Sequence, residues 1–239
     1  QALNYFNSVL QNDPKNIKSL FNKGICLYNM NKIDESIPIF EQVNNMDPNF
    51  VDGLLYLGRA YSDVNDFSNA FSCYEQILRN DSNNFEALMQ KAILLADMGR
   101  FDESLSVCNS ALSIAPFKPY LLLNKAKILS ILGKHTESEL ILNKVLKSEP
   151  NKFDALKERG IILAKTGRVM DALKQFEECL IIKPKDSEIL FQKGLCLCSI
   201  GKHQEAETCL DQVILHNKEN IEAMYQKSKI QVMLGKINE

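Results

Sequence analysis

Apolar residues recur along the chain at the spacing of an amphipathic helix, and the same arrangement returns every 34 residues. Residues three or four positions apart fall on one face of a helix, so this spacing indicates a packed helical face. We number each 34-residue unit from its own first residue, which is Ile17 in the first full unit. Unit position 4 is then large and apolar throughout: Leu20, Leu54, Leu88, Leu122, Leu156, Leu190 and Met224. The pattern predicts an all-α chain of repeated helix pairs.

Turn residues follow the same 34-residue period. Five prolines share one unit position, where a second helix would end, because proline cannot continue a helix interior. They are Pro14, Pro48, Pro116, Pro150 and Pro184. Unit position 15 holds only Asn or Gly, which tolerate the left-handed backbone that ends a helix. We therefore predict a first helix over unit positions 1–14 and a second over 18–31, joined by tight turns.

This register divides the chain into repeats. Six full repeats are predicted at residues 17–50, 51–84, 85–118, 119–152, 153–186 and 187–220. Residues 1–16 correspond to the second helix of a truncated repeat, and residues 221–239 to the first helix of another. We expect residues 1–239 to form a single array. Because neither end carries the polar capping helix that repeat arrays normally need, we also expect a fragment of a longer array.

The packing positions alternate in size. Unit positions 8 and 20 are small and unit position 24 is mostly large, as in Gly58, Ala70 and Tyr74. Small residues on facing helices let the two axes approach closely, and the large residue fills the space beside them. Unit position 7 is usually Lys or Arg. We expect these side chains to lay their aliphatic stems along apolar surface and to keep their charges in water.

The repeat resembles the tetratricopeptide repeat (TPR) family, whose pattern is W-x2-L-G-x2-Y, then A-x3-F, then P. The best match is the unit that contains Leu54, Leu57, Gly58, Tyr61, Ala70 and Tyr74. The chain departs from the pattern in having no Trp. The resemblance implies a right-handed αα-superhelix, or solenoid, of helix-turn-helix repeats. It also implies a scaffold for protein–protein interaction.

Unit positions 2, 6, 9 and 13 lie opposite the packed face of the first helix. The resemblance implies that this face lines the concave side of the superhelix, where a peptide would bind. Unit position 6 reads Asn22, Tyr56, Gln90, Asn124, Glu158, Gln192 and Gln226. A side-chain amide offers one donor and one acceptor group to a peptide unit, so this column would grip an extended backbone. The alternative is an ordinary solvated helix face.

Unit position 5 flanks the same face with a largely apolar stripe: Phe21, Leu55, Met89, Leu123, Lys157, Phe191 and Tyr225. If exposed, the stripe calls for a partner; alternatively, it packs each first helix against its neighbour. Unit position 2 is acidic in five units, at Asp52, Glu86, Asp154, Glu188 and Glu222. These acids either stabilise helix N-termini or form a negative rim that favours basic or neutral peptides.

One binding mode of the family is disfavoured. Modules similar to this chain clamp a C-terminal carboxylate with Lys, Asn and Arg from three successive repeats. Aligned on Asn124, two of the cationic slots hold Asp154 and Glu158. Aligned on Gln192, one holds Glu222. These acids would repel a carboxylate.

Composition excludes several other classes. The net charge is −2, without the basic excess of a nucleic-acid binder. No apolar run reaches the ~18 residues that span a membrane. The seven cysteines are scattered singly, which favours small buried residues in a reducing, cytoplasmic compartment. Catalytic motifs, P-loops and metal-ligand spacings are absent from the sequence, so we predict no enzyme, no cofactor and no metal site.

The leading hypothesis is a protein–protein interaction scaffold that binds an extended peptide or partner protein on its concave face. Two alternatives remain. One is a structural assembly unit that stacks head-to-tail through its open ends, with Met224 and Ser228 of one copy meeting Ala2, Phe6 and Val9 of the next. The other is a regulatory arm of a larger enzyme.

Overall fold

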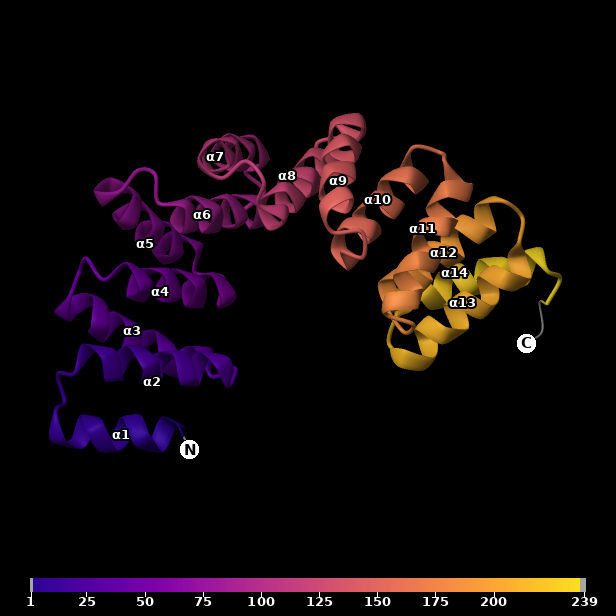
Figure 1. Cartoon of the computed structure of the whole chain (residues 1–239). Helices are drawn as coiled ribbons and strands as arrows, with labels where there is room; N and C mark the ends of the chain where they lie inside the picture. The colour runs from indigo at the N-terminus through magenta and orange to yellow at the C-terminus, as the bar shows by residue number, and fades with distance from the viewer. Residues whose placement is uncertain (1, 237–239) are drawn as a thin grey trace. The chain divides into compact units, whose positions relative to one another are not determined.

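The computed structural model describes residues 2–236. These residues form helices and no strand. The helices that open each repeat, here called A helices, are α2 Ile17–Asn29, α4 Val51–Asp63, α6 Phe85–Asp97, α8 Pro119–Ile131, α10 Phe153–Lys165, α12 Ser187–Ser199 and α14 Ile221–Met233. The B helices are α1 Ala2–Asn12, α3 Ile33–Met46, α5 Phe67–Asn80, α7 Phe101–Ile114, α9 His135–Ser148, α11 Val169–Ile182 and α13 His203–His216. The all-α repeat fold is therefore confirmed, and the helices follow one another in pairs joined by short turns (Figure 1).

The chain divides into two compact units, residues 1–124 and 125–239, and the boundary in the sequence falls within α8. We call these two halves of the chain unit 1 and unit 2 and describe each by itself. They are distinct from the 34-residue repeats, whose residues keep the numbering by unit position. Inside both units A helices pack on the B helices that follow them, as α4 does on α5 and α12 on α13. Some A helices also contact the next A helix, as α4 contacts α6 and α10 contacts α12. The single array predicted over residues 1–239 stays a prediction, and its residues 1 and 237–239 lie outside the described part.

Helix ends follow the predicted turn residues to within one position. Asn31 and Asn65 have φ near +60°, and the glycines of the same column have φ between +73° and +79°. The N–H of the following residue donates to the carbonyl five residues back, as Arg100 does to Leu95 at 2.8 Å. This left-handed cap closes the A helix at unit position 13, and the B helix begins at 17 instead of the predicted 18.

The predicted packing of small residues against large ones forms the contact between A and B helices. An added Cβ on Gly160 would lie 2.6 Å from Phe176, whose ring is fully buried. The same contact joins Gly58 to Tyr74 at 2.6 Å. Where unit position 8 is Ala, a buried Ser at position 20 donates to its carbonyl, as Ser138 does to Ala126 at 2.6 Å. These residues thus set the distance between paired helices.

The position-4 column is buried in most repeats but not in all. Leu54 and Leu156 are 1% and 3% exposed. Leu122 is only half-buried, whereas its neighbour Leu121 is fully buried, so Leu122 does not follow the column. Met224, on the last A helix, is 48% exposed.

A recurring polar contact joins successive repeats and corrects the expectation for unit position 7. The cations of this column do not simply extend into water. Four of them reach position 25 of the preceding B helix, sixteen residues back: Lys91 to Glu75 at 2.5 Å, Arg159 to Asn143 at 3.0 Å, Lys193 to Glu177 at 3.3 Å and Lys227 to Asp211 at 2.7 Å. An acid or amide stands at position 25 in every repeat. The A helix therefore places its cation against the neighbouring repeat, which helps to set the register between repeats.

Candidate functional site

A cavity of about 250 Å³ opens on the A-helix face of unit 1. Its walls come from α2, α4, α5, α6 and the first turn of α8: Tyr28, Arg59, Ser62, Asp63, Tyr74, Gln90, Ile93, Leu94, Asp97 and Tyr120. Six of these side chains occupy unit positions 2, 6, 9 or 13, which the sequence places on the face opposite the packed one. The cavity therefore coincides with the predicted binding face.

Aromatic rings build the wall next to this cavity. Phe21 lies edge-to-face with Tyr56 at 5.5 Å between ring centroids and with Phe50 at 4.9 Å. Tyr56 also contacts Tyr28 at 6.0 Å and Phe40 at 5.7 Å. Such edge-to-face pairs add about 0.5–1.5 kcal/mol beyond burial of area. The cluster gives α2 and α4 a rigid, ring-lined surface.

Arg59 holds the centre of the cavity wall. Its guanidinium lies 5.5 Å from the centre of the Tyr56 ring and pairs with Glu86 at 3.1 Å. With the amide oxygen of Gln90 turned toward it, Arg59 also donates to Gln90 from Nε at 3.1 Å and from Nη2 at 2.9 Å. One cation thus connects the aromatic wall on α4 to two polar side chains on α6.

Two carboxylates face the same space from the last residues of α4 and α6. Asp63 accepts a hydrogen bond from the Tyr28 hydroxyl at 2.6 Å. The pKa of the Tyr28 hydroxyl is raised to about 12, mainly by burial and secondly by this hydrogen bond. Burial alone raises the pKa of Asp97 above its ordinary value. A carboxylate at a helix C-terminus is unfavourable with respect to the helix dipole, so both positions favour an approaching cation or hydrogen-bond donor.

The position-6 column is present, but most of its polar groups are occupied by the chain itself. Asn22 donates to the Lys18 carbonyl at 2.8 Å, and Gln226 donates to Glu222 at 2.8 Å. Tyr56 belongs to the aromatic cluster described above. Nδ2 of Asn124 is buried without a partner. Gln192 makes no side-chain hydrogen bond among the described residues.

Glu158 interrupts the amide column in unit 2. Burial raises the pKa of its carboxyl group, and the nearby Lys127, Lys157 and Lys165 partly oppose this rise. Beside it, Lys157 pairs with Glu188 of the next repeat at 2.8 Å. In unit 2 an acid flanked by lysines thus stands where unit 1 has the aromatic ring of Tyr56.

The position-5 stripe divides into two groups. Leu55 and Leu123 are 7% and 3% exposed, which agrees with the packing alternative for these two. Phe21, Met89 and Phe191 are half-buried, and Tyr225 is 57% exposed. Only the last four therefore remain available to a partner.

Sequence reasoning missed the residues that complete the cavity, namely Tyr28, Arg59, Asp63, Asp97 and Tyr120. A signal existed, because unit positions 9 and 13 share a helix face with position 6. Arg59, Asp63, Asp97 and Tyr120 stand at positions 2, 9 and 13 of this face, whereas Tyr28 at position 12 lies outside it.

Neither a metal centre nor a membrane-spanning helix is found in the described part of the chain. Residues 2–236 contain no group of three or more His, Cys, Asp or Glu side chains placed to hold a metal ion. None of the described helices is long and apolar enough to cross a membrane. None of the seven cysteines forms a disulfide, and four of them are buried.

The fold and this face define a class: a repeat protein of stacked helix pairs with a binding face on its A helices. Family models described as tetratricopeptide repeats match residues 17–50 and 119–152, and residues 55–119. The first two ranges coincide with predicted repeats. The chain belongs to the tetratricopeptide repeat family, whose members generally act as protein-interaction scaffolds.

Solved structures share the fold. A chain of the APC/C heterotetramer Cut9–Hcn1 matches 94% of this chain with a TM-score of 0.84 at 15% identity. The match covers 45% of that protein's length. A tetratricopeptide repeat protein from Parabacteroides merdae matches with a TM-score of 0.77 at 14% identity, covering 96% of this chain and 91% of that one. PilF from Pseudomonas aeruginosa matches with a TM-score of 0.76 at 13% identity, covering 91% and 97%. The sequence matches no curated protein.

Proposed function

We propose that this chain is a protein-interaction scaffold that binds an extended segment of a partner protein along its A-helix face. The cavity of unit 1 carries the proposal. It combines aromatic rings, a guanidinium and two carboxylates around a space of about 250 Å³. Tyr and Arg are the residue types that most often dominate binding energy at protein interfaces.

The position-6 amides are proposed as secondary contacts. Each neutral hydrogen bond contributes about 0.5–1.5 kcal/mol net. Asn22 and Gln226 would also have to exchange an existing bond within the chain for one with the partner. The exposed ring of Tyr120, at 51% of its surface, is a stronger candidate contact. Phe21 and Met89 extend the surface within unit 1, and Phe191 and Tyr225 are proposed contacts within unit 2. The net charge of −2 favours a protein partner over a nucleic acid.

The test begins with peptides selected from a random library against the chain, whose affinities are measured by calorimetry. We expect the double variant Gln90→Ala/Tyr120→Ala to raise Kd at least tenfold. The matched control is Gln192→Ala/Glu222→Ala, which changes the same unit positions three repeats later. Peptides that lose affinity only with the control variant, or with neither, would contradict the unit 1 site.

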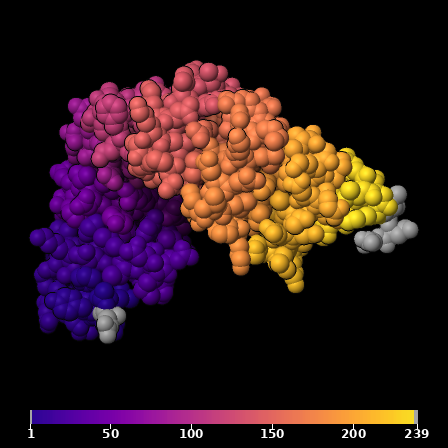
Figure 2. All heavy atoms as spheres, turned by 45° about the vertical axis from the view of Figure 1, so that its right-hand side comes forward, coloured from indigo at the N-terminus to yellow at the C-terminus, as the bar shows by residue number. Residues whose placement is uncertain are grey.

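Head-to-tail self-association is the second candidate, and uncovered apolar side chains at the chain ends favour it. On α14, Met224, Tyr225 and Val232 are 48%, 57% and 63% exposed, and Tyr5 on α1 is 68% exposed. The indigo atoms of α1 lie at an outer edge of unit 1, and the yellow atoms of α14 lie at an outer edge of unit 2 (Figure 2). The A helix α14 of one copy would then pair with the B helix α1 of a second copy.

Sedimentation over a wide concentration range tests this candidate. We expect a mass that rises with concentration and a Met224→Glu variant that stays monomeric. A parent chain that remains monomeric throughout would exclude stacking. A cytoplasmic location, the absence of catalysis and the regulatory-arm alternative stay proposals about the whole protein; the fold is typically non-catalytic.

A further inference from the structure

The contacts between cations at unit position 7 and acids or amides at unit position 25 of the preceding repeat form a polar column. One repeat of this column lacks its cation. Unit position 7 is Leu57 in the repeat 51–84, where Lys91, Lys193 and Lys227 stand in other repeats. The acid that such a cation would meet is Glu41, at unit position 25 of the preceding repeat. Glu41 accepts a hydrogen bond from the Tyr61 hydroxyl at 2.5 Å and has no ion-pair partner among the described residues.

A cavity of about 400 Å³ lies at this place, between α3 and α5 and above α4. It is distinct from the cavity on the A-helix face, since its walls are mostly B-helix side chains. They are Glu41, Asn44, Asn45, Leu57, Tyr61, Asn69, Ser72, Cys73 and Gln76. Glu41 is the one ionised group among them, so the cavity carries an uncompensated negative charge.

A second acceptor in the cavity wall has no donor. Oδ1 of Asn44 is buried and makes no hydrogen bond. A buried acceptor without a donor costs roughly as much as a lost hydrogen bond, so such atoms in a folded protein call for a partner. Glu41 and Asn44 both line this cavity, and a cation that donates hydrogen bonds would pair with the Glu41 carboxylate.

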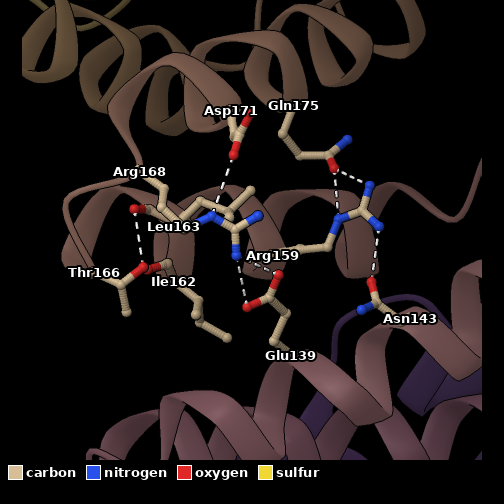
Figure 3. A network of polar contacts seen from close by, with 9 residues as sticks. All are labelled: Glu139, Asn143, Arg159, Ile162, Leu163, Thr166, Arg168, Asp171 and Gln175. Carbon is tan, nitrogen blue, oxygen red and sulfur yellow. Dashed lines mark hydrogen bonds and ion pairs between the residues drawn. The ribbon is translucent and has the colours of Figure 1, made fainter.

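The equivalent cavity of unit 2 contains such a group from the chain itself. About 370 Å³ in volume, it lies between α9 and α11, three repeats further along. Arg159 stands there at the unit position of Leu57 and donates to Asn143, which stands in place of Glu41, at 3.0 Å. Arg159 also donates to Gln175 from Nε at 2.7 Å (Figure 3).

The remaining charges of the unit 2 cavity are compensated as well. Arg168 bridges Glu139 at 2.9 Å and Asp171 at 3.2 Å. The walls there carry three cations and three acids, whereas the walls of the unit 1 cavity carry a single acid.

We propose that the cavity between α3 and α5 is a binding site for the primary ammonium group of a lysine side chain from a partner polypeptide. The ammonium takes the place that a position-7 lysine occupies elsewhere in the array. It donates to the Glu41 carboxylate. Lysine is favoured over arginine because every acid at position 25 that is paired in this chain, at Glu75, Glu177 and Asp211, is paired with lysine.

The rim of the cavity favours a side chain carried on a polypeptide. Asn45 and Asn69 are exposed amides, and Gln76 is half-buried. Asn69 already donates to Asp66 at 2.8 Å and Gln76 to the Pro48 carbonyl at 2.7 Å, so these two offer their carbonyl oxygens. Primary amides match the donor and acceptor pattern of a peptide unit. They would contact the backbone on either side of the inserted lysine.

The test uses Nα-acetyl-lysine N-methylamide, titrated into the isotope-labelled chain and followed by backbone amide shifts. We expect saturable shifts in α3 and α5, with Kd on the order of millimolar, as for a small ligand that makes few contacts. Glu41→Gln should raise Kd at least tenfold. Leu57→Lys should do the same, because the chain then supplies its own ammonium. The lysine stem is tolerated at this position in the other repeats, and a circular-dichroism melt checks folding.

Matched controls separate this site from general charge effects and from the A-helix face. Glu35→Gln removes an exposed acid from the same helix, and Gln90→Ala/Tyr120→Ala alters the proposed function's site; each should change Kd less than twofold. Nα-acetyl-glutamine N-methylamide should not bind. Absence of saturable shifts, or binding that Glu41→Gln leaves intact, would overturn the proposal. Binding of 1,4-diaminobutane without binding of the blocked lysine would overturn the polypeptide source.

Discussion

Unit 1 and unit 2 bury the same contact between paired helices and differ in the polar cavities beside it. Tyr74 packs on Gly58 in unit 1 as Phe176 packs on Gly160 in unit 2, and an added Cβ would lie 2.6 Å from the ring in both. Three repeats apart, however, Leu57 stands where Arg159 does. The contact between glycine and ring is thus kept, while unit position 7 changes from the buried Leu57, 3% exposed, to Arg159.

The A-helix faces differ in the same way. Tyr28, Tyr56 and Asp63 of unit 1 correspond to Ser130, Glu158 and Lys165 of unit 2. An aromatic wall beside two carboxylates is replaced by a charged surface. This difference shows that a few small and large residues at the helix contact are enough to specify the helix pair. The residues on the outward face can therefore differ between the units. Recognition should therefore be local to one unit, although both share the fold.

The largest effect is expected where the two units agree. Phe176→Ala and Tyr74→Ala should each destabilise their own unit by about 3–5 kcal/mol, as for a buried aromatic residue. The two costs should agree to within about 1 kcal/mol, since both rings rest on a glycine. Native-state hydrogen exchange is the suitable measurement, because repeat arrays do not unfold in one step. Costs that differ widely between the units would show that the shared core is not equivalent.

Arg159→Leu should convert the unit 2 cavity to the arrangement of unit 1. Gln175 is 3% exposed, and its carbonyl oxygen would lose its donor. A buried acceptor left without a partner costs about 1–3 kcal/mol. Hydrogen exchange in α10 and α11 measures the loss. Arg159→Lys retains one donor and should cost less; an equal loss in both variants would point to packing of the stem instead.

The glycine column offers a matched pair of substitutions. Gly160→Ala places a Cβ against the buried Phe176 ring and should cost about 1–2 kcal/mol, because overpacking outweighs the better helix propensity of alanine. Gly194→Ala places its Cβ 3.4 Å from Leu210, an ordinary contact distance. That variant should be neutral or slightly stabilising in a thermal melt. A reversed order would contradict the size complementarity.

The fold followed from the sequence because it rests on local, periodic signals. Asn31 and Gly99 end their helices where the period predicts, and Gly58 faces Tyr74 as the alternation of size predicts. The surface sites were less predictable. Each requires side chains from three or more helices to converge, and the rotation between successive repeats decides which ones meet. The contacts between position 7 and position 25 did leave a signal in the sequence, because a cation at position 7 often follows an acid sixteen residues earlier. The signal spans two repeats, so it is not visible within one A helix.

The smallest effect concerns the polar column itself and compares one ion pair from each unit. Lys91 and Glu75 in unit 1 lie 2.5 Å apart with side chains 19% and 29% exposed. Lys193 and Glu177 in unit 2 lie 3.3 Å apart, and Glu177 is 60% exposed. Coupling between charges weakens as water screens them, so a double-mutant cycle should give up to about 1 kcal/mol for the first pair and about 0.3 kcal/mol for the second. Each cycle uses Lys→Met and Glu→Gln, which preserve side-chain length.

Raising the salt concentration to about 1 M should reduce both couplings, and that of the exposed pair more completely, because at this concentration salt screens charges beyond a few ångströms. A coupling in unit 2 as large as that in unit 1 would mean that burial does not decide the strength of the column. In that case the missing cation at Leu57 would carry less weight as the mark of a binding site.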